Sequence, residues 1–236
     1  MINHGKTNWI LASTLITAFV LSGCAGFTPP PPFPTDPNAQ NHYDAGERFL
    51  EAQRYDMAAA EFEKSLEFES VAYITHSKLA VAYFVQQKFA DAARQFEATY
   101  WLWGGPGSGA AWAIMQAVSL QRAGNQDEAE TLLRQWTTSG VVCTPTGCYT
   151  AGDPLRGPVK LLARYLLGAV DENSVLNQTP ADSLPFSYLV IGISNATKGD
   201  TERAKEFLQL FAATTTTPKS GWTFALARAE MRNLEE

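Results

Sequence analysis

The chain has 236 residues, 45% of them hydrophobic and 18% charged, which is the balance of a globular protein with one main domain. Its 18 Lys and Arg against 24 Asp and Glu give a formal net charge of −6, and the sequence has no basic run. An acidic chain of this kind argues against nucleic acid as a partner and against a protein surface that binds anionic lipid headgroups.

The first residues have the pattern of a secretory signal peptide. A positive charge at Lys6 precedes the apolar stretch 10–20, which is shorter than the roughly 20 residues that cross a bilayer as a helix. The next residues, LSGC ending at Cys24, resemble the lipobox of bacterial lipoproteins. This resemblance implies removal of residues 1–23, fatty acyl chains such as palmitate on Cys24 and, with Ala25 following, an outer-membrane anchor that faces the periplasm. The alternative is an ordinary cleaved signal peptide followed by a chance cysteine.

A proline-rich segment, residues 24–38, follows the signal peptide. Four consecutive prolines at 29–32 cannot donate backbone hydrogen bonds, and each disfavours helix in the residue before it. We expect an extended polyproline tether that reaches on the order of 30 Å and holds the folded part clear of the membrane. A docking ligand for a proline-binding partner is the alternative.

Residues 39–138 contain an internal repeat of 34 residues. A shift of that length aligns Gly46 with Ala80, Phe49 with Tyr83, Ala58 with Ala92, and Phe62 with Phe96. This period and this order of small and aromatic residues resemble the tetratricopeptide repeat, or TPR. In a third unit the four positions hold Ala117, Leu120, Ala129 and Leu133, with a turn at Gly124-Asn125. A more distant fourth unit has Gly192, Asn195, Ala204 and Leu208, with a turn at Gly199-Asp200.

The resemblance implies an all-α fold of stacked TPR-like helical hairpins, an alpha solenoid. Apolar residues at intervals of three and four indicate helices buried on one side, which stacked neighbours cover. We expect three repeats at 39–138, an irregular insert with a helix from Pro158 to Val170 at 139–183, and a fourth hairpin within 184–236. A final capping helix, Trp222–Asn233, is expected to cover the end of the stack. Almost no strand is expected.

The two remaining cysteines, Cys143 and Cys148, form an even pair in the oxidising compartment that a signal peptide implies. Pro145 and Gly147 lie between them, so the chain can reverse and bring the sulfurs together. We expect a disulfide that closes a small loop, with free thiols as the alternative. The spacing is not that of a redox C-x-x-C motif, and two thiolates without a histidine nearby in sequence make a poor zinc site.

No residue pattern indicates an enzyme, and none requires a cofactor. The sequence lacks a Walker loop, G-x-G-x-x-G, H-E-x-x-H and a nucleophile–base signature. The glycine-rich run 104–109 lacks the lysine of a phosphate loop, so we expect it to be a connector. His42 and His76 lie 34 residues apart and therefore occupy equivalent repeat positions, where packing is the main interpretation and metal binding the alternative.

In TPR domains the first helix of each hairpin lines a concave face that usually binds peptides or helices. The resemblance therefore implies a partner-binding face here, and the apolar residues of the second repeat favour an apolar segment or amphipathic helix of an envelope protein over a C-terminal carboxylate. The competing explanation is that the chain's own C-terminal helix covers this face. The candidate residues are Tyr43, Glu47, Leu50, Glu51, Ile74, Ser77, Val81, Phe84, Val85, Ile114, Val118, Gln121 and Arg122.

The leading hypothesis for function is a scaffold or adaptor for an envelope assembly machine, such as a pilus, secretion, outer-membrane or cell-wall apparatus. Anchor, tether and repeats together motivate it. The alternative is a small-molecule or glycan-binding lipoprotein that uses an aromatic patch at Trp101 and Trp103, because tryptophan is enriched at binding hot spots. Packing between the second and third repeats is the other interpretation of that patch.

Overall fold

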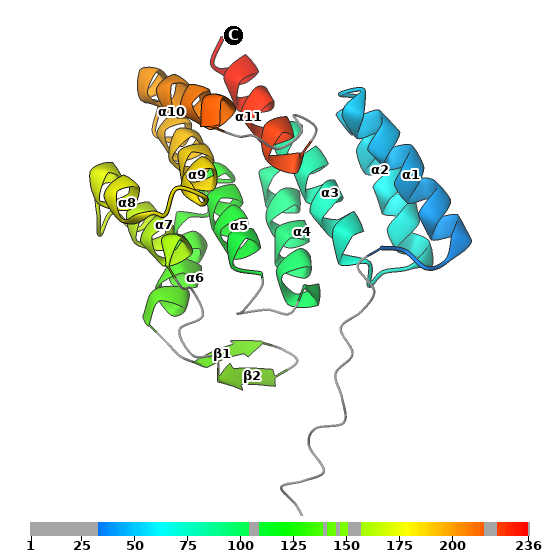
Figure 1. Cartoon of the computed structure of the whole chain (residues 1–236). Coiled ribbons are helices and arrows are strands. Elements are labelled where there is room, and N and C mark those ends of the chain that lie inside the picture. The colour runs from blue at the N-terminus through cyan, green and yellow to red at the C-terminus, as the bar shows by residue number, and fades with distance from the viewer. Residues whose placement is uncertain are drawn as a thin grey trace, which may run out of the picture.

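The computed structural model describes residues 33–103, 109–138, 141–144, 147–150, 157–214 and 221–235. These residues form eleven helices and two short strands, and the helices stand side by side in a curved row (Figure 1). The expected signal peptide, the lipidation site Cys24, most of the tether and most of the glycine-rich connector lie outside the described residues. Within the described part, no helix combines the length and the apolar character needed to cross a membrane.

The helices follow one another as pairs joined by short turns, as the sequence predicts for residues 39–138 and for the fourth hairpin. In order, α1 packs on α2, α3 on α4, α5 on α6, α7 on α8, and α9 on α10 (Figure 1). The helices are α1 (Pro37–Glu51), α2 (Tyr55–Phe68), α3 (Tyr73–Val85), α4 (Phe89–Leu102), α5 (Ala110–Arg122), α6 (Gln126–Thr138), α7 (Pro158–Leu166), α8 (Glu172–Gln178), α9 (Leu184–Thr197), α10 (Thr201–Thr214) and α11 (Trp222–Asn233).

Local sequence explains where the first helix begins. The Asp36 carboxylate accepts hydrogen bonds from the backbone N–H groups of Asn38 at 2.7 Å and Ala39 at 3.1 Å, and Pro37 is the first helical residue. An acidic N-cap satisfies N–H groups that have no partner inside the helix, and proline is tolerated at this position. Glu69 accepts the N–H of Asp36 at 2.8 Å, which ties the start of α1 to the end of α2.

One turn geometry recurs at the junction inside five helix pairs. In each, the N–H of the residue after the turn donates to the carbonyl five positions back, at 2.8 to 3.0 Å. The turn residues, all with positive φ, are Gln53, Gln87, Gly124, Gly168 and Gly199. The expected helix from Pro158 to Val170 needs correction, because α7 ends at Leu166, before the turn at Gly168, and α8 follows from Glu172, where no helix was expected. Glycine readily adopts the left-handed conformation that ends a helix, so the insert contains a short hairpin of its own.

Small residues mark the places where the two helices of a pair touch. A Cβ atom at Gly46 of α1 would lie 2.5 Å from a ring carbon of Phe62 on α2. In the last pair, a Cβ at Gly192 of α9 would lie 2.9 Å from Leu208 on α10. Both approaches join residues 16 positions apart, so the sequence pattern located the same contact in two distant parts of the chain.

The expectation of almost no strand needs correction between α6 and α7. Here β1 (Val141–Thr144) and β2 (Gly147–Thr150) pair antiparallel, with Cys143 opposite Cys148 in the register. The β-branched residues of this segment favour extended pairing over helix. Opposite residues of such a pair have Cα atoms about 4.5–5.5 Å apart, a separation that a disulfide spans. The disulfide itself stays a prediction.

Candidate interaction groove

The C-terminal helix α11 lies across the inner face of the row of helices (Figure 1). It packs on α3 and on the pair α9 and α10, rather than covering the end of the stack. Val81, Phe84, Ile114 and Val118, all on the predicted partner-binding face, are at most 1% exposed and share one apolar core with Leu226 of α11. The chain's own C-terminal helix therefore covers the part of that face on α3, as the competing explanation expected, while α7 and α9 also pack on α5.

Several other candidates on this face are also occupied by contacts within the chain. Tyr43 and Ser77 are buried, and Ile74 and Val85 are half-buried against the apolar core. The Gln121 side-chain amide donates to a backbone carbonyl of α7 at 3.5 Å. None of these five side chains lines the groove that remains.

An ion pair holds α11 to α5. Arg122 Nη1 lies 3.0 Å from Glu230 Oε2, and the two side chains are 14% and 2% exposed. The Arg122 guanidinium also lies 4.7 Å from the centroid of the Phe89 ring. Burial raises the pKa of Glu230 above its ordinary value, against a smaller lowering by Arg122. This pair could not be predicted from a local sequence pattern, because its members are 108 residues apart.

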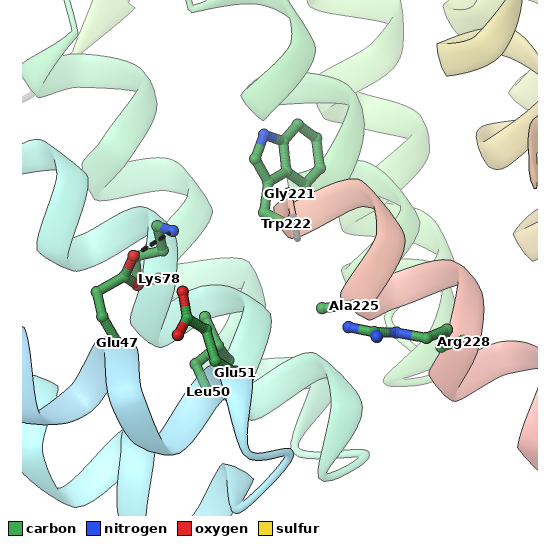
Figure 2. Close-up of a pocket in the computed structure, with 8 residues that line it drawn as sticks. All are labelled: Glu47, Leu50, Glu51, Lys78, Gly221, Trp222, Ala225 and Arg228. Carbon is green, nitrogen blue, oxygen red and sulfur yellow. Dashed lines mark hydrogen bonds and ion pairs between the residues drawn. The ribbon is translucent and has the colours of Figure 1, made fainter. Parts of the chain in front are cut away.

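A groove of about 220 Å³ remains between α1, α3 and the first turns of α11 (Figure 2). Leu50 and Ala225 give it an apolar part, and Gly221 and Trp222 close one end. Of the predicted face, only the three residues from the last turns of α1 reach it. The lining residues are Glu47, Leu50, Glu51, Lys78, Gly221, Trp222, Ala225 and Arg228.

The two walls of the groove carry different charges. Figure 2 shows Glu47, Glu51 and Lys78 on one side and Arg228 on the other. Lys78 Nζ lies 2.9 Å from Glu47 Oε2, while Glu47 Oε1 is buried without a hydrogen-bond partner in the described part of the chain. Glu51 and Arg228 are exposed. A buried carboxylate oxygen without a partner favours a ligand that donates a hydrogen bond to it.

Known proteins do not name a ligand for this groove. No family model, no curated protein and no solved structure matches the chain. The chemistry of the lining residues is therefore the guide to what binds there.

The aromatic patch predicted at Trp101 and Trp103 does not line the groove. Trp101 is half-buried against the core, and Trp103 is 38% exposed, with its ring centroid 4.3 Å from that of Tyr73. The tryptophan that does line the groove is Trp222, which packs on Trp112 at 4.7 Å between centroids. From the sequence, Trp222 was expected only as the first residue of the final helix. That position does not tell what the helix packs against.

The polar Asn195 of the fourth unit belongs to a partly buried network rather than to the groove. Glu172 of α8 accepts hydrogen bonds from Asn195 Nδ2 at 2.7 Å and from Arg203 Nε at 2.8 Å. The network joins α8, α9 and α10. It explains why a polar side chain takes a position that is aromatic or apolar in the other units.

The two histidines occupy equivalent places in the first two helix pairs. His42 Nδ1 lies 2.7 Å from Glu61 Oε2, and His76 Nδ1 lies 2.6 Å from Gln95 Oε1. Both contacts join residues 19 positions apart, so the interaction repeats with the period of the sequence. Among the described residues, no group of three or more His, Cys, Asp or Glu side chains is placed to hold a metal ion.

Proposed function

We propose that the chain is a non-enzymatic adaptor: a TPR-like helical scaffold, anchored to the outer membrane through acyl chains on Cys24 and facing the periplasm. In this proposal it serves an envelope assembly machine by binding a segment of a partner protein in the groove between α1 and α11. The observation that carries the proposal is the groove itself. It is a hollow with charged walls and an apolar part on a face that α11 otherwise fills.

The groove favours a short peptide segment over the amphipathic helix expected from the sequence, because α11 already occupies the place of such a helix. Its volume, about 220 Å³, has room for one or two side chains. A basic side chain or N–H donor of the partner would face Glu47 and Glu51, and an acidic group would face Arg228. An apolar side chain between them would rest on Leu50 and Ala225.

Crosslinking in living cells tests this proposal. A photoreactive residue in place of Glu51, at the rim of the groove, is expected to capture one envelope protein. The same residue in place of Glu97, which is exposed on α4 away from the groove, is the matched control and is expected to capture none. Equal adducts from both positions, or no adduct from position 51, would count against the groove as the working site.

A charge-reversal variant sharpens the test. Arg228→Glu places a carboxylate where the partner's acidic group is expected, so the adduct from position 51 should be lost through like-charge repulsion. Arg94→Glu changes another exposed arginine, which lies on α4 and pairs with Asp91, and it should leave the adduct intact. Retention of the adduct in Arg228→Glu would show that Arg228 does not bind an acidic group of the partner.

A further inference from the structure

Exposed apolar side chains gather at one edge of the molecule. Among the described residues, five large hydrophobic side chains are more than a third exposed. Four of them lie just before α1, at the end of α2, between α2 and α3, and at the end of α4. These four define the aromatic edge: Phe33 before α1 at 51%, Phe68 at the end of α2 at 52%, Val71 between α2 and α3 at 42%, and Trp103 at the end of α4 at 38%. Figure 1 shows the start of α1 and the ends of α2 and α4 together on one side.

Each exposed ring of this edge rests on another ring. Phe33 meets Tyr43 at 6.0 Å between centroids, and Phe68 stacks on His42 at 5.7 Å with an interplanar angle of 10°. Trp103 meets Tyr73 edge-on at 4.3 Å. Rings held in this way lose little conformational freedom when they bind, so the edge is prepared for contact with an apolar surface.

The described part of the chain begins at Phe33, at this same edge. Phe33 follows Cys24 by nine residues, which span at most about 30 Å when fully extended. A membrane that holds Cys24 is therefore always within reach of the aromatic edge, and a short link of this kind gives the contact a high effective concentration. A partner protein has no such advantage at this edge.

We propose that the aromatic edge lies on the surface of the membrane that anchors the chain, with Phe33, Phe68, Val71 and Trp103 at the level of the lipid headgroups, in place of the clearance from the membrane that was expected of the tether. Aromatic rings favour that region because they combine an apolar body with a polar or polarisable edge. The inference rests on the proposed anchoring through Cys24. In this orientation α1, a helix of 15 residues, begins at the membrane and points away from it. Its last turn, and with it the groove, therefore lies on the side away from the bilayer.

The charges near this edge favour a zwitterionic surface. Glu67 beside Phe68 is exposed, Glu69 is half-buried and accepts the N–H of Asp36, and Lys64 one turn earlier pairs with Glu61 at 2.8 Å. Attraction to anionic lipids therefore does not drive the contact, and we expect anionic lipid to weaken it and salt to leave binding to neutral lipid unchanged.

Quenching of tryptophan fluorescence tests this inference on the full lipidated chain in phosphatidylcholine vesicles with brominated acyl chains. The fluorescence of Trp103 is obtained as the difference in emission between the wild-type chain and Trp103→Phe. We expect brominated lipid to quench this fluorescence. The double variant Phe68→Ser and Val71→Ser should lose most of this quenching. Leu210→Ser changes the fifth exposed side chain, which lies on α10 away from this edge, and should keep it.

The outcomes separate this inference from the proposed function. A chain that floats with the vesicles while its Trp103 stays unquenched keeps the anchor and overturns the contact of the edge. A chain that does not float with the vesicles overturns the anchoring through Cys24, and the inference with it. Unchanged quenching in the double variant would show that Phe68 and Val71 do not contact the membrane, and would overturn the proposed contact of the edge.

Discussion

In the turns of the first two helix pairs, one residue has an unfavourable left-handed backbone conformation, which lowers the stability of the fold. Gln87 adopts φ 60, whereas the third pair has Gly124 with φ 82 at the equivalent turn. A residue with a Cβ atom pays roughly 1 kcal/mol or more for the left-handed conformation, a cost that glycine does not have. The first two turns are therefore more strained than the later ones.

The variant Gln87→Gly is expected to raise the free energy of unfolding by up to about 1 kcal/mol, because relief of steric strain exceeds the added freedom of the unfolded chain. The Gln87 side chain is exposed, so few contacts are lost. Urea unfolding followed by circular dichroism measures the change. Glu97→Gly, exposed within α4, is the matched control and should lower the free energy of unfolding by about 1 kcal/mol. A loss of stability in Gln87→Gly would show that the turn is not strained.

The roles of some single residues could be predicted from the sequence, and those of others could not. Gly46 and Gly192 were predicted as helix contacts, because a small residue opposite a large one recurs at a fixed spacing. The role of Asn195 was not predicted, because its partner Glu172, which also accepts from Arg203, lies on another helix. A local pattern reports how a residue packs within its own hairpin and not which distant side chain it meets.

At the scale of elements, α11 carries a buried carboxyl group, Glu230, that resists ionisation in the folded chain. Burial raises the pKa of Glu230, so the folded chain holds this proton more tightly than the unfolded chain, whose Glu has an ordinary pKa near 4.5. The stability that the group contributes is therefore fully present below about pH 4.5, and it is lost as pH rises through the raised pKa of the folded state.

The variant Glu230→Gln cannot titrate and keeps an oxygen that accepts from Arg122. Between pH 4.5 and pH 8, the wild-type chain is therefore expected to lose stability relative to this variant, as measured by urea unfolding at each pH. Glu130→Gln is a useful contrast, because Gln126 and Arg134 lower the pKa of Glu130 and the sign of its pH dependence is opposite. A difference between wild type and Glu230→Gln that stays constant with pH would contradict a raised pKa in the folded chain.

For the whole molecule, the position of α11 decides which surface is available. The helix carries Leu226, fully buried in the common core, on the same turns as Arg228, which is exposed at the groove. One face of α11 thus closes the inner surface of the row of helices, and the opposite face builds one wall of the groove. Loss of α11 would expose an apolar surface and remove the groove at once.

The variant Leu226→Asp is expected to release α11, because it places a charge without a partner in the core. We expect the free energy of unfolding to fall by at least about 3 kcal/mol, with increased binding of an apolar fluorescent dye and faster amide exchange in α3 and α5. Arg228→Asp, on the exposed face of the same helix, should change stability by no more than about 0.5 kcal/mol. Equal effects of the two variants would contradict the description of α11 as a helix docked through one face.

Most helices, most of their turns and the residues that touch within the first, second and fourth pairs could be predicted from the sequence. These features depend on apolar spacing, on glycine and on a period of 34 residues, which are signals within a short stretch of chain. Only the tertiary structure decided where α11 lies, that Arg122 meets Glu230, and that the groove is built from Glu47 and Glu51 together with Arg228. The physical reason is that these contacts join residues more than 100 positions apart, and their energy depends on how whole helices pack.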